Sequence, residues 1–422
     1  MEVGLPSRRR SACCMRLLLI APTLVVGGHH PIYVSAILTE ASSRKWRVDL
    51  VTAPGDLNHA MGFTIIDAVE QTGGNVTYCP FAKPKVNGLF SWAIGQWQRW
   101  NSVHQAWVSA KRKASYDVVF VLDGDGWYVP SLVFGPPVEG VPLVTIMLRL
   151  RYQWDLERQY RKKLRASTIQ RTIFESYLRL NWVAAVCVCN ASLMQIYRNN
   201  DGSWWSRKLH YVPDFGQTPI LTNRAEARRR LGLPAEGRIV ACVGGLGERK
   251  NLFQLFQALG APVCPGDICA LLMGQVAPEF RARLRDGLVD LLLQRRRLFL
   301  FEGAYNAEQL SLALSAADCA WLCYRQHLGS SGFLWEAAQA GLPIVGCAGG
   351  EIAHQIESLK LGLAITDEDP AFVALALDRA TRPSEETRQW RENCLLAGMA
   401  HTSTAFGRAV CEVIQEASTA GS

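Results

Sequence analysis

The sequence predicts an α/β protein built from two doubly wound parallel sheets, each covered by helices on both faces. Its 422 residues exceed what one ordinary hydrophobic core holds, so two domains are expected. Apolar runs of strand length recur without polar alternation, and longer segments of helical character separate them. This pattern is typical of buried parallel sheets. Hydrophobic residues make up 49% and charged residues 19% of the chain, a composition that excludes a disordered protein.

The N-terminal half holds a first series of predicted strands. These are Leu17–Ala21, Val48–Thr52, Val76–Cys79, Val118–Leu122, Leu143–Met147 and Ala184–Cys189. The connectors between them, such as Ile32–Ser43 and Leu89–Lys113, are helical in character. Because helices alternate with strands, each strand is expected to lie parallel to its neighbours.

The C-terminal half repeats this organisation. Its predicted strands are Ile239–Val243, Ile268–Met273, Leu298–Phe301, Cys319–Leu322 and Ile344–Cys347. Pro278–Leu293 and Ala307–Ala316 are expected to be helices, and only helices are expected after Asp367. The two series are separated by “PDFGQTPILTNR”, residues 213–224, which is rich in Pro, Gly and Thr. Ligands of such sheets bind beyond the carboxyl ends of the strands, so we expect the site in a cleft between the halves.

The stretch “RRRSACCMRLLLIAPTLVVGG” imitates a secretory signal, since basic residues precede an apolar run. The apolar part is short, ends at Pro22 and leads into a glycine loop. We therefore expect a first buried strand, with Met15 as an alternative start and residues 1–14 as a disordered extension. No run of eighteen or more apolar residues occurs elsewhere, so no membrane-spanning helix is predicted.

The thirteen cysteines are scattered and form no CxxC pair. Cys187 and Cys189 lie two apart in an apolar run, where strand alternation places both on one face. This spacing favours buried packing thiols over a metal or redox site, and it indicates a reducing cytoplasm. The net charge of +8 suits anionic partners such as phosphates or a membrane surface; no nucleic-acid partner is expected.

The first strand is followed by the loop “TLVVGGHHPIYVSAI”. Gly27 and Gly28 let the backbone approach a ligand closely, and a helix is expected to begin near His30. Free N–H groups at a helix start favour an anion or a hydroxyl-rich group. His29 or His30 could face the cleft, but a surface or capping role is an equal alternative.

The second loop, “VGGLGERKNLFQLF”, follows the first strand of the second half. It combines three glycines with Arg249 and Lys250 just before the next helix. A glycine loop, two cations and a helix N-terminus together favour a diphosphate. The alternative is a basic helix start on the surface.

The third loop is “HLGSSGFLWEAAQAGLPIVG”, residues 327–346. Ser330 and Ser331 are expected to cap a helix that begins near Gly332, which again leaves N–H groups for an anion. Glu336 lies one turn further on and faces roughly the same way as Gly332. Its carboxylate would repel phosphate but could bind a ribose diol. The alternative is a solvent-facing helix residue.

These loops, in this order, resemble those of GT-B glycosyltransferases, most closely the large retaining family 4. The resemblance covers most of the chain, from “MRLLLIAPT…GGHH” through “VPDFG”, “VGGLGERKN”, “LFEGAYNAEQLSLALSAADCAWLCY” and “GSSGFLWEAAQAGLPIVG” to “GG…LGLAI”. It implies two Rossmann-like domains that face a cleft. Residues 15–215 would be the acceptor domain, residues 216–400 the donor domain, and residues 401–422 a helix that packs back on the first domain.

The resemblance also implies a function. Family 4 enzymes transfer a sugar from a nucleotide-sugar donor, so we expect a hexosyltransferase that acts with retention and without metal or cofactor. Lys250 matches the lysine that contacts the donor diphosphate, and Glu336 the second glutamate of the E-x7-E element, which holds the ribose. Ser331 and Gly332 match the loop whose backbone meets the phosphates. No catalytic nucleophile is implied.

Further positions follow from the same resemblance. Tyr305 and Asn306 lie in the segment that passes the nucleotide base, and the loop of Gly27 and Gly28 borders the acceptor and the phosphate. The implied acceptor is a saccharide or a lipid-linked glycan, and the implied location is the cytoplasm, with the inner face of the membrane as a variant.

Three positions depart from the family pattern. Leu328 stands where the first glutamate of E-x7-E is expected, and Gly245 stands where the donor loop usually has an arginine, so Arg249 is expected to supply that charge. Residues 147–149 lack the usual histidine. The first two departures leave open a non-catalytic subunit that binds a nucleotide or a partner enzyme. A nucleotide-sugar epimerase would need acid and base residues in the cleft, and the N-terminal loops offer few beyond His29 and His30.

Two other features allow more than one interpretation. “LDGDGWY” contains Asp123 and Asp125 in a DxD triplet, which we interpret as a turn with two solvated acids and not as a metal site. The segment “FSWAIGQWQRWNSVHQAW” contains four tryptophans, and residues 148–180 are basic and aromatic. Such helices could rest on an anionic bilayer, although most tryptophan stripes belong to the core.

Overall fold

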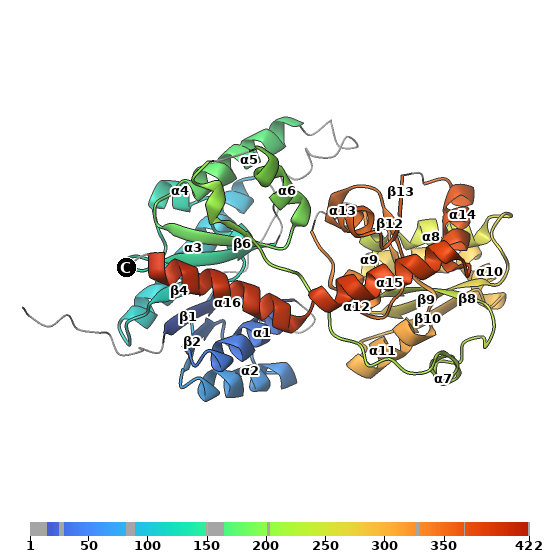
Figure 1. The fold of residues 1–422 in the computed structure, drawn as a ribbon, viewed down its shortest axis with the longest axis horizontal. Coiled ribbons are helices and arrows are strands. Elements are labelled where there is room, and N and C mark those ends of the chain that lie inside the picture. The colour runs from blue at the N-terminus through green and yellow to red at the C-terminus, as the bar shows by residue number, and fades with distance from the viewer. Residues whose placement is uncertain are drawn as a thin grey trace, which may run out of the picture.

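The computed structural model describes residues 15–24, 29–81, 89–148, 150, 164–200, 203–325, 327, 329–366 and 368–420. Gly27, Gly28, Leu328 and the proposed extension 1–14 lie outside these ranges. The chain forms two α/β units, each with one parallel sheet between helices (Figure 1). The predicted fold class is confirmed.

The N-terminal sheet has seven strands in the order β3-β2-β1-β4-β5-β6-β7, and all neighbours pair in parallel. The strands are β1 (Arg16–Ala21), β2 (Arg47–Thr52), β3 (Val76–Tyr78), β4 (Val118–Val121), β5 (Leu143–Met147), β6 (Val183–Val188) and β7 (Leu209–Tyr211). Its helices are α1 (His29–Ser43), α2 (Ala60–Gln71), α3 (Leu89–Lys111), α4 (Ser131–Phe134), α5 (Leu164–Leu178) and α6 (Ala191–Asn200), with 3-10 turns η1 (Gly124–Gly126) and η4 (Ser206–Lys208).

The C-terminal sheet has six parallel strands in the order β10-β9-β8-β11-β12-β13. They are β8 (Arg238–Val243), β9 (Ile268–Gly274), β10 (Leu298–Glu302), β11 (Cys319–Leu322), β12 (Ile344–Cys347) and β13 (Gly362–Ile365). Its helices are α7 (Arg224–Arg230), α8 (Leu252–Gly260), α9 (Pro278–Arg281), α10 (Gly287–Gln294), α11 (Ala307–Ala316), α12 (Gly332–Gln339), α13 (Gly350–Leu359), α14 (Pro370–Thr381) and α15 (Glu385–Ala400), with 3-10 turns η5 (Glu248–Lys250) and η6 (Arg283–Arg285).

The unalternating strands are explained by burial on both faces. Along β1, Leu17 and Leu19 enter one hydrophobic core, whereas Leu18 and Ile20 enter a second core on the opposite face. The same division holds along β8 of the other sheet. Each strand therefore needs apolar side chains at odd and even positions alike.

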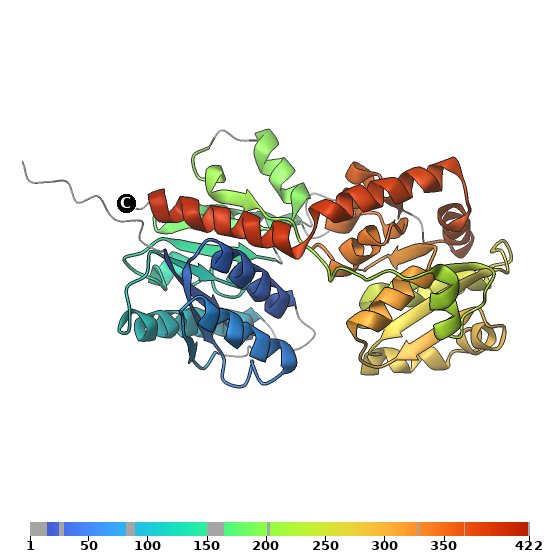
Figure 2. The ribbon, with the colours of Figure 1, turned by 60° about the horizontal axis from the view of Figure 1, so that its bottom comes forward.

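The last helix, α16 (Ser403–Ala420), returns to the N-terminal domain and packs against α1 (Figures 1 and 2). Phe406, Val410 and Ile414 are fully buried there. A Cβ on Gly407 would lie 2.4 Å from the carbonyl oxygen of Ala36, so glycine permits this close approach of the two helices.

The structure corrects several predicted elements. The short strands β7 and β13 were not predicted, because their sequences, LHY and GLAI, contain a histidine and a leading glycine and so form no clear apolar run. The single helix expected over Pro278–Leu293 is wrong: it is divided into α9, η6 and α10, and Asp286 caps α10 through the N–H of Leu288. Within the described ranges, no helix has the length and apolarity needed to cross a membrane.

The prediction for the paired cysteines is confirmed. Cys187 and Cys189 are buried free thiols in the same core. Burial raises the pKa of both thiols well above the usual range, so they remain protonated and unreactive.

Candidate functional site

The donor loop predicted at the end of β8 forms a tight turn followed by η5. Gly244 has φ of +110°, a conformation that favours glycine. A Cβ on Gly245 would meet no atom within 4 Å, so the neighbouring position is open. The loop therefore exposes backbone at the carboxyl end of a central strand.

Lys250 lies beneath this loop with only 2% of its surface exposed. Its ammonium donates to the Val243 carbonyl oxygen at 2.5 Å and to the Tyr324 hydroxyl at 3.0 Å. It also lies over the rings of Tyr324 and Phe333, 4.9 and 5.3 Å from their centroids. None of the ion pairs among the described residues includes Lys250. A buried charge without a carboxylate partner is costly, and an anionic ligand would stabilise it.

Arg249 occupies the exposed side of the same turn. Its guanidinium lies 4.8 Å from the centroid of the Tyr324 ring. Its Nη1 atom lies 3.3 Å from Nδ1 of His327, which belongs to the third loop. Arg249 is therefore accessible to a ligand outside the loop, whereas the Lys250 side chain is buried close to Gly244.

The third loop leads into α12 as expected, but the predicted serine cap is wrong. Ser331 is the N-cap residue in an extended conformation, and its side chain makes no capping hydrogen bond. The Ser330 hydroxyl instead accepts a hydrogen bond from Trp335 Nε1 at 3.2 Å. Gly332 begins the helix next to the linker residues Phe215 and Gly216.

Glu336 points back toward this linker. Its Oε1 accepts a hydrogen bond from the Gln217 main-chain N–H at 3.1 Å. A Cβ on Gly216 would lie 2.3 Å from Glu336 Cγ. Burial raises the pKa of Glu336 to about 7, and the positive charge of Lys250 partly opposes this rise. Glu336 is therefore not a solvent-facing helix residue, and its carboxylate lies within the electrostatic range of Lys250.

Tyr305 lies beside both residues. Burial and the charge of Glu336 raise its pKa to about 12, while Lys250 opposes the rise. A Cβ on Gly244 would lie 3.2 Å from Lys250 Nζ and 3.9 Å from the Tyr305 hydroxyl. Three segments that are distant in the sequence thus bring Tyr305, Lys250 and Glu336 together.

Asn306, the second residue expected near the base, has a structural role. Its side chain accepts from the Gln309 N–H at 2.9 Å, and the Gln309 side chain accepts from the Asn306 N–H at 3.0 Å. This capping box begins α11. The side chain is therefore occupied by the helix start, and the backbone and Tyr305 are left to meet a ligand.

The two histidines of the first loop have different positions. His30 Nδ1 lies 3.0 Å from the Thr23 carbonyl oxygen, so this ring faces its own domain. His29 is exposed, and its Cε1 atom would lie 3.1 Å from a Cβ on Gly332. His29 therefore reaches the start of α12 across the domain junction.

The DxD triplet forms a turn, but the prediction of two solvated acids is wrong for Asp125. Its Oδ2 accepts from the Leu148 N–H at 2.6 Å, and Asp123 pairs with Arg99 at 3.2 Å. Throughout the described part of the chain, no group of three or more His, Cys, Asp or Glu side chains could hold a metal ion.

Sequence reasoning missed Tyr324, Phe333, Gly216 and Gln217. Tyr324 lies two residues after the end of β11, so an aromatic residue near a strand's carboxyl end was the available signal. Two surface cavities lie elsewhere: one is lined by Arg238, Asp267 and Asp318, the other by Tyr211, Trp335 and His401. Neither cavity is lined by Lys250, Tyr305 or Glu336.

Comparison with known proteins identifies what the chain is similar to. Residues 223–394, which include Lys250, Tyr305 and Glu336, match the family described as glycosyl transferases group 1. No protein with a curated description matches the chain in sequence.

Solved structures share the fold along nearly the whole length. Sucrose-phosphate synthase from Thermosynechococcus elongatus has 17% identity and a TM-score of 0.70, over 96% of this chain and 100% of that one. HepE from Anabaena, in complex with UDP, has 15% identity and a TM-score of 0.65, over 95% and 100%. WaaG, a glycosyltransferase involved in lipopolysaccharide biosynthesis, has 16% identity and a TM-score of 0.60, over 95% and 99%.

The chain therefore has the GT-B fold of glycosyltransferases, and its C-terminal domain is similar to glycosyl transferases group 1. The resemblance predicted from the loops is confirmed at this level.

Proposed function

We propose that this protein is a glycosyltransferase whose C-terminal domain holds a nucleotide-sugar donor. The observation that carries the proposal is the buried ammonium of Lys250, which lacks an ion-pair partner among the described residues and lies near Glu336. A diphosphate next to Lys250 and a ribose next to Glu336 would satisfy both groups. Tyr305 would lie along the nucleotide between them.

The same groups suit the chemistry of transfer. Glycosyl transfer passes through an oxocarbenium-like state while negative charge grows on the leaving diphosphate. Lys250, Arg249 and the N-terminal turn of α12, with Ser331 and Gly332, would stabilise that charge where it develops. We propose that these groups act without a metal, that the sugar is a hexose, and that its configuration is retained. HepE has been solved in complex with UDP-glucose, so uridine nucleotides are the first donors to test.

We propose that the N-terminal domain binds the acceptor, with His29 at the boundary between acceptor and donor. The acceptor would be a saccharide or a lipid-linked glycan. Trp97 and Ile94 on α3 are 44% and 41% exposed, whereas Trp107 is a core residue. The exposed pair supports peripheral contact with an anionic membrane in the cytoplasm. Failure to sediment with anionic liposomes at low salt would remove this part of the proposal.

A second candidate is a non-catalytic subunit that binds a nucleotide. The observation that favours it is Gly245, which offers no side chain to the donor at an open position of the loop. Incubating the purified protein with nucleotide sugars separates the two candidates, because a pure binding subunit releases no nucleoside diphosphate.

A thermal-shift screen against nucleoside diphosphates tests the donor site directly. Stabilisation by one base at low concentration is expected, since a ligand that binds only the native state raises its stability. The Lys250→Ala variant should lose this stabilisation while it keeps the fold. If no diphosphate stabilises the wild-type protein, the proposed donor site is wrong.

A further inference from the structure

The two domains are joined by a carboxylate that the proposed reaction does not use. Glu351 lies in the first turn of α13, in the C-terminal domain, and is 1% exposed. Its Oε1 accepts from the Ala191 N–H at 2.8 Å, and its Oε2 accepts from the Ser192 N–H at 3.1 Å and the Ser192 hydroxyl at 2.6 Å. Ala191 and Ser192 begin α6, which belongs to the N-terminal domain.

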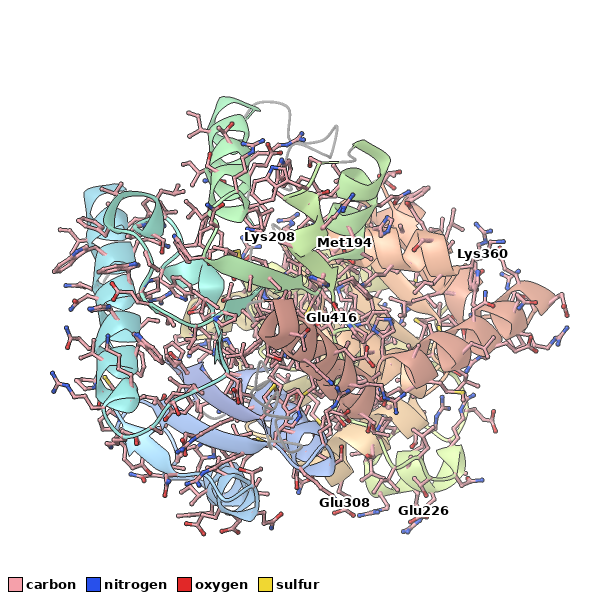
Figure 3. All side chains as sticks on the ribbon, turned by 60° about the vertical axis from the view of Figure 1, so that its left-hand side comes forward. Met194, Lys208, Glu226, Glu308, Lys360 and Glu416 are labelled. Atoms are coloured by element: carbon pink, nitrogen blue, oxygen red, sulfur yellow. The ribbon has the colours of Figure 1, made fainter. Side chains whose placement is uncertain are left out.

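The carboxylate thus lies between the N-terminal ends of two helices from different domains. Figure 1 shows α6 and α13 facing each other across the junction, and the two helices are in contact. Figure 3 shows Met194, on α6, beside the helices of the C-terminal domain. Both helix starts carry partial positive charge and would repel each other. One negative group between them converts this repulsion into attraction.

Among the residues that the structure describes, no Lys, Arg or His forms an ion pair with Glu351. Its fourth hydrogen bond comes from Gln355 Nε2 of its own helix at 2.9 Å. Cys189 and Tyr211 are its other titratable neighbours, with Asp214 beyond them, and burial keeps the thiol and the phenol protonated. Burial raises the pKa of Glu351 to about 7, against the opposing effect of the hydrogen bonds from Ser192 and Ala191. The α6 donors are therefore what make a charge tolerable here.

We propose that Glu351 is an interdomain positioning residue, which fixes the angle between the domains by capping α6 from across the junction. The domain angle determines whether His29 reaches the start of α12, where its ring approaches Gly332. Lys250, Tyr324 and Glu336 all belong to the C-terminal domain, so nucleotide binding does not depend on the contact between Glu351 and α6. Sugar transfer does depend on this contact, because the acceptor in the N-terminal domain must lie next to the donor in the C-terminal domain.

The test compares Glu351→Ala and the milder Ser192→Ala, which removes one donor, with Glu357→Gln as a control. Glu357 is exposed on the same helix, so its loss should change nothing. The readouts are the radius of gyration from X-ray scattering, the Kd for the nucleoside diphosphate that stabilises the wild type, and the rate of donor turnover. The turnover readout rests on the proposed function, whereas the scattering readout does not.

We expect Glu351→Ala to expand the molecule and to lower turnover on the order of 100-fold, since small misplacements of reacting groups cost that much. Its nucleotide Kd should stay within about twofold of the wild type, because the donor residues are untouched. Ser192→Ala should shift scattering and turnover in the same direction by less. Glu351→Gln, which keeps one acceptor oxygen, should recover part of the turnover.

An unchanged radius of gyration in Glu351→Ala overturns the proposal, as does a nucleotide affinity that falls as much as turnover. If Glu351→Ala does not fold, Ser192→Ala is judged by the same two criteria. A wild-type protein that binds no nucleoside diphosphate refutes the proposed function alone, and the scattering comparison still decides the role of Glu351.

Discussion

Replacing Lys250 by methionine removes the buried charge and keeps a stem that can pack against Tyr324 and Phe333. The ammonium would make at least one charge-assisted hydrogen bond to a donor diphosphate. Such a bond contributes about 1.5–3 kcal/mol. Its loss should therefore weaken nucleotide binding roughly 10- to 150-fold.

The fold should tolerate this change. Val243 and Tyr324 each lose a hydrogen-bond donor, which destabilises the protein, but the variant no longer buries an ammonium. These effects oppose each other, so the free energy of unfolding should change by less than about 2 kcal/mol. Isothermal titration with the stabilising nucleoside diphosphate measures the affinity, and urea unfolding measures the stability.

Lys208→Met is the matched control. Lys208 also donates to a main-chain carbonyl, that of Leu180 at 2.7 Å, but it lies in the N-terminal domain (Figure 3). Its loss should leave nucleotide affinity unchanged. A Lys250→Met protein that folds normally and binds the nucleotide within twofold of the wild type would refute the assignment of Lys250 to the diphosphate.

Three further predictions test the surroundings of the site. Burial raises the pKa of Glu336 from its ordinary value of 4.5 to about 7 in the folded protein. The native state therefore binds more protons than the unfolded state between these two pH values, and stability falls as pH rises through them. Glu336→Gln should therefore be more stable than the wild type at pH 8, by up to about 3 kcal/mol, and equally stable at pH 4, as pH-dependent urea unfolding would measure. Gly216→Ala should destabilise the protein by about 1–3 kcal/mol, because its Cβ would lie 2.3 Å from the Gly332 carbonyl oxygen. Gly245→Ala should cost less than about 0.5 kcal/mol, because its Cβ would meet no atom within 4 Å. Equal losses of stability for the two variants in thermal unfolding would contradict this prediction. Phe406→Ala should destabilise the protein by about 3–5 kcal/mol, since the fully buried ring packs on Tyr33 and Phe215. Urea unfolding measures this loss, and a smaller value would show that α16 contributes little to the N-terminal core.

The sequence determined the two sheets because their strands are unusually uniform. Leu17 to Ala21 are all fully buried, and an apolar run of this length between helical segments has few other interpretations. The short strands β7 and β13 lack that signal, and the break at Asp286 depends on one capping side chain within an otherwise helical pattern. Boundaries set by single hydrogen bonds are less visible than elements set by burial.

In the candidate site, too, some residues could be predicted from local sequence patterns and others could not. Glycine loops and cations at strand ends indicated Lys250 and Glu336, because the carboxyl ends of parallel strands share one edge of the sheet. Gln217 was not predictable, since it approaches Glu336 through tertiary packing and carries no local pattern, and the only signal for Tyr324 was its place after a strand. The serine cap failed for a related reason: Ser330 accepts from Trp335, and local sequence does not disclose that competition.

The link between Glu336 and the chain that joins the domains has a consequence for donor binding. Oε1 of Glu336 is held by the main-chain N–H of Gln217, a residue of the segment between the two sheets. A ribose that uses one hydroxyl can bind Oε2 and leave this hydrogen bond intact. A ribose that uses both hydroxyls must share or displace the Gln217 N–H, and it then acts on the segment that connects the domains. The proposed donor would in that case act on the segment that carries Gln217, which is separate from the contact between Glu351 and the start of α6.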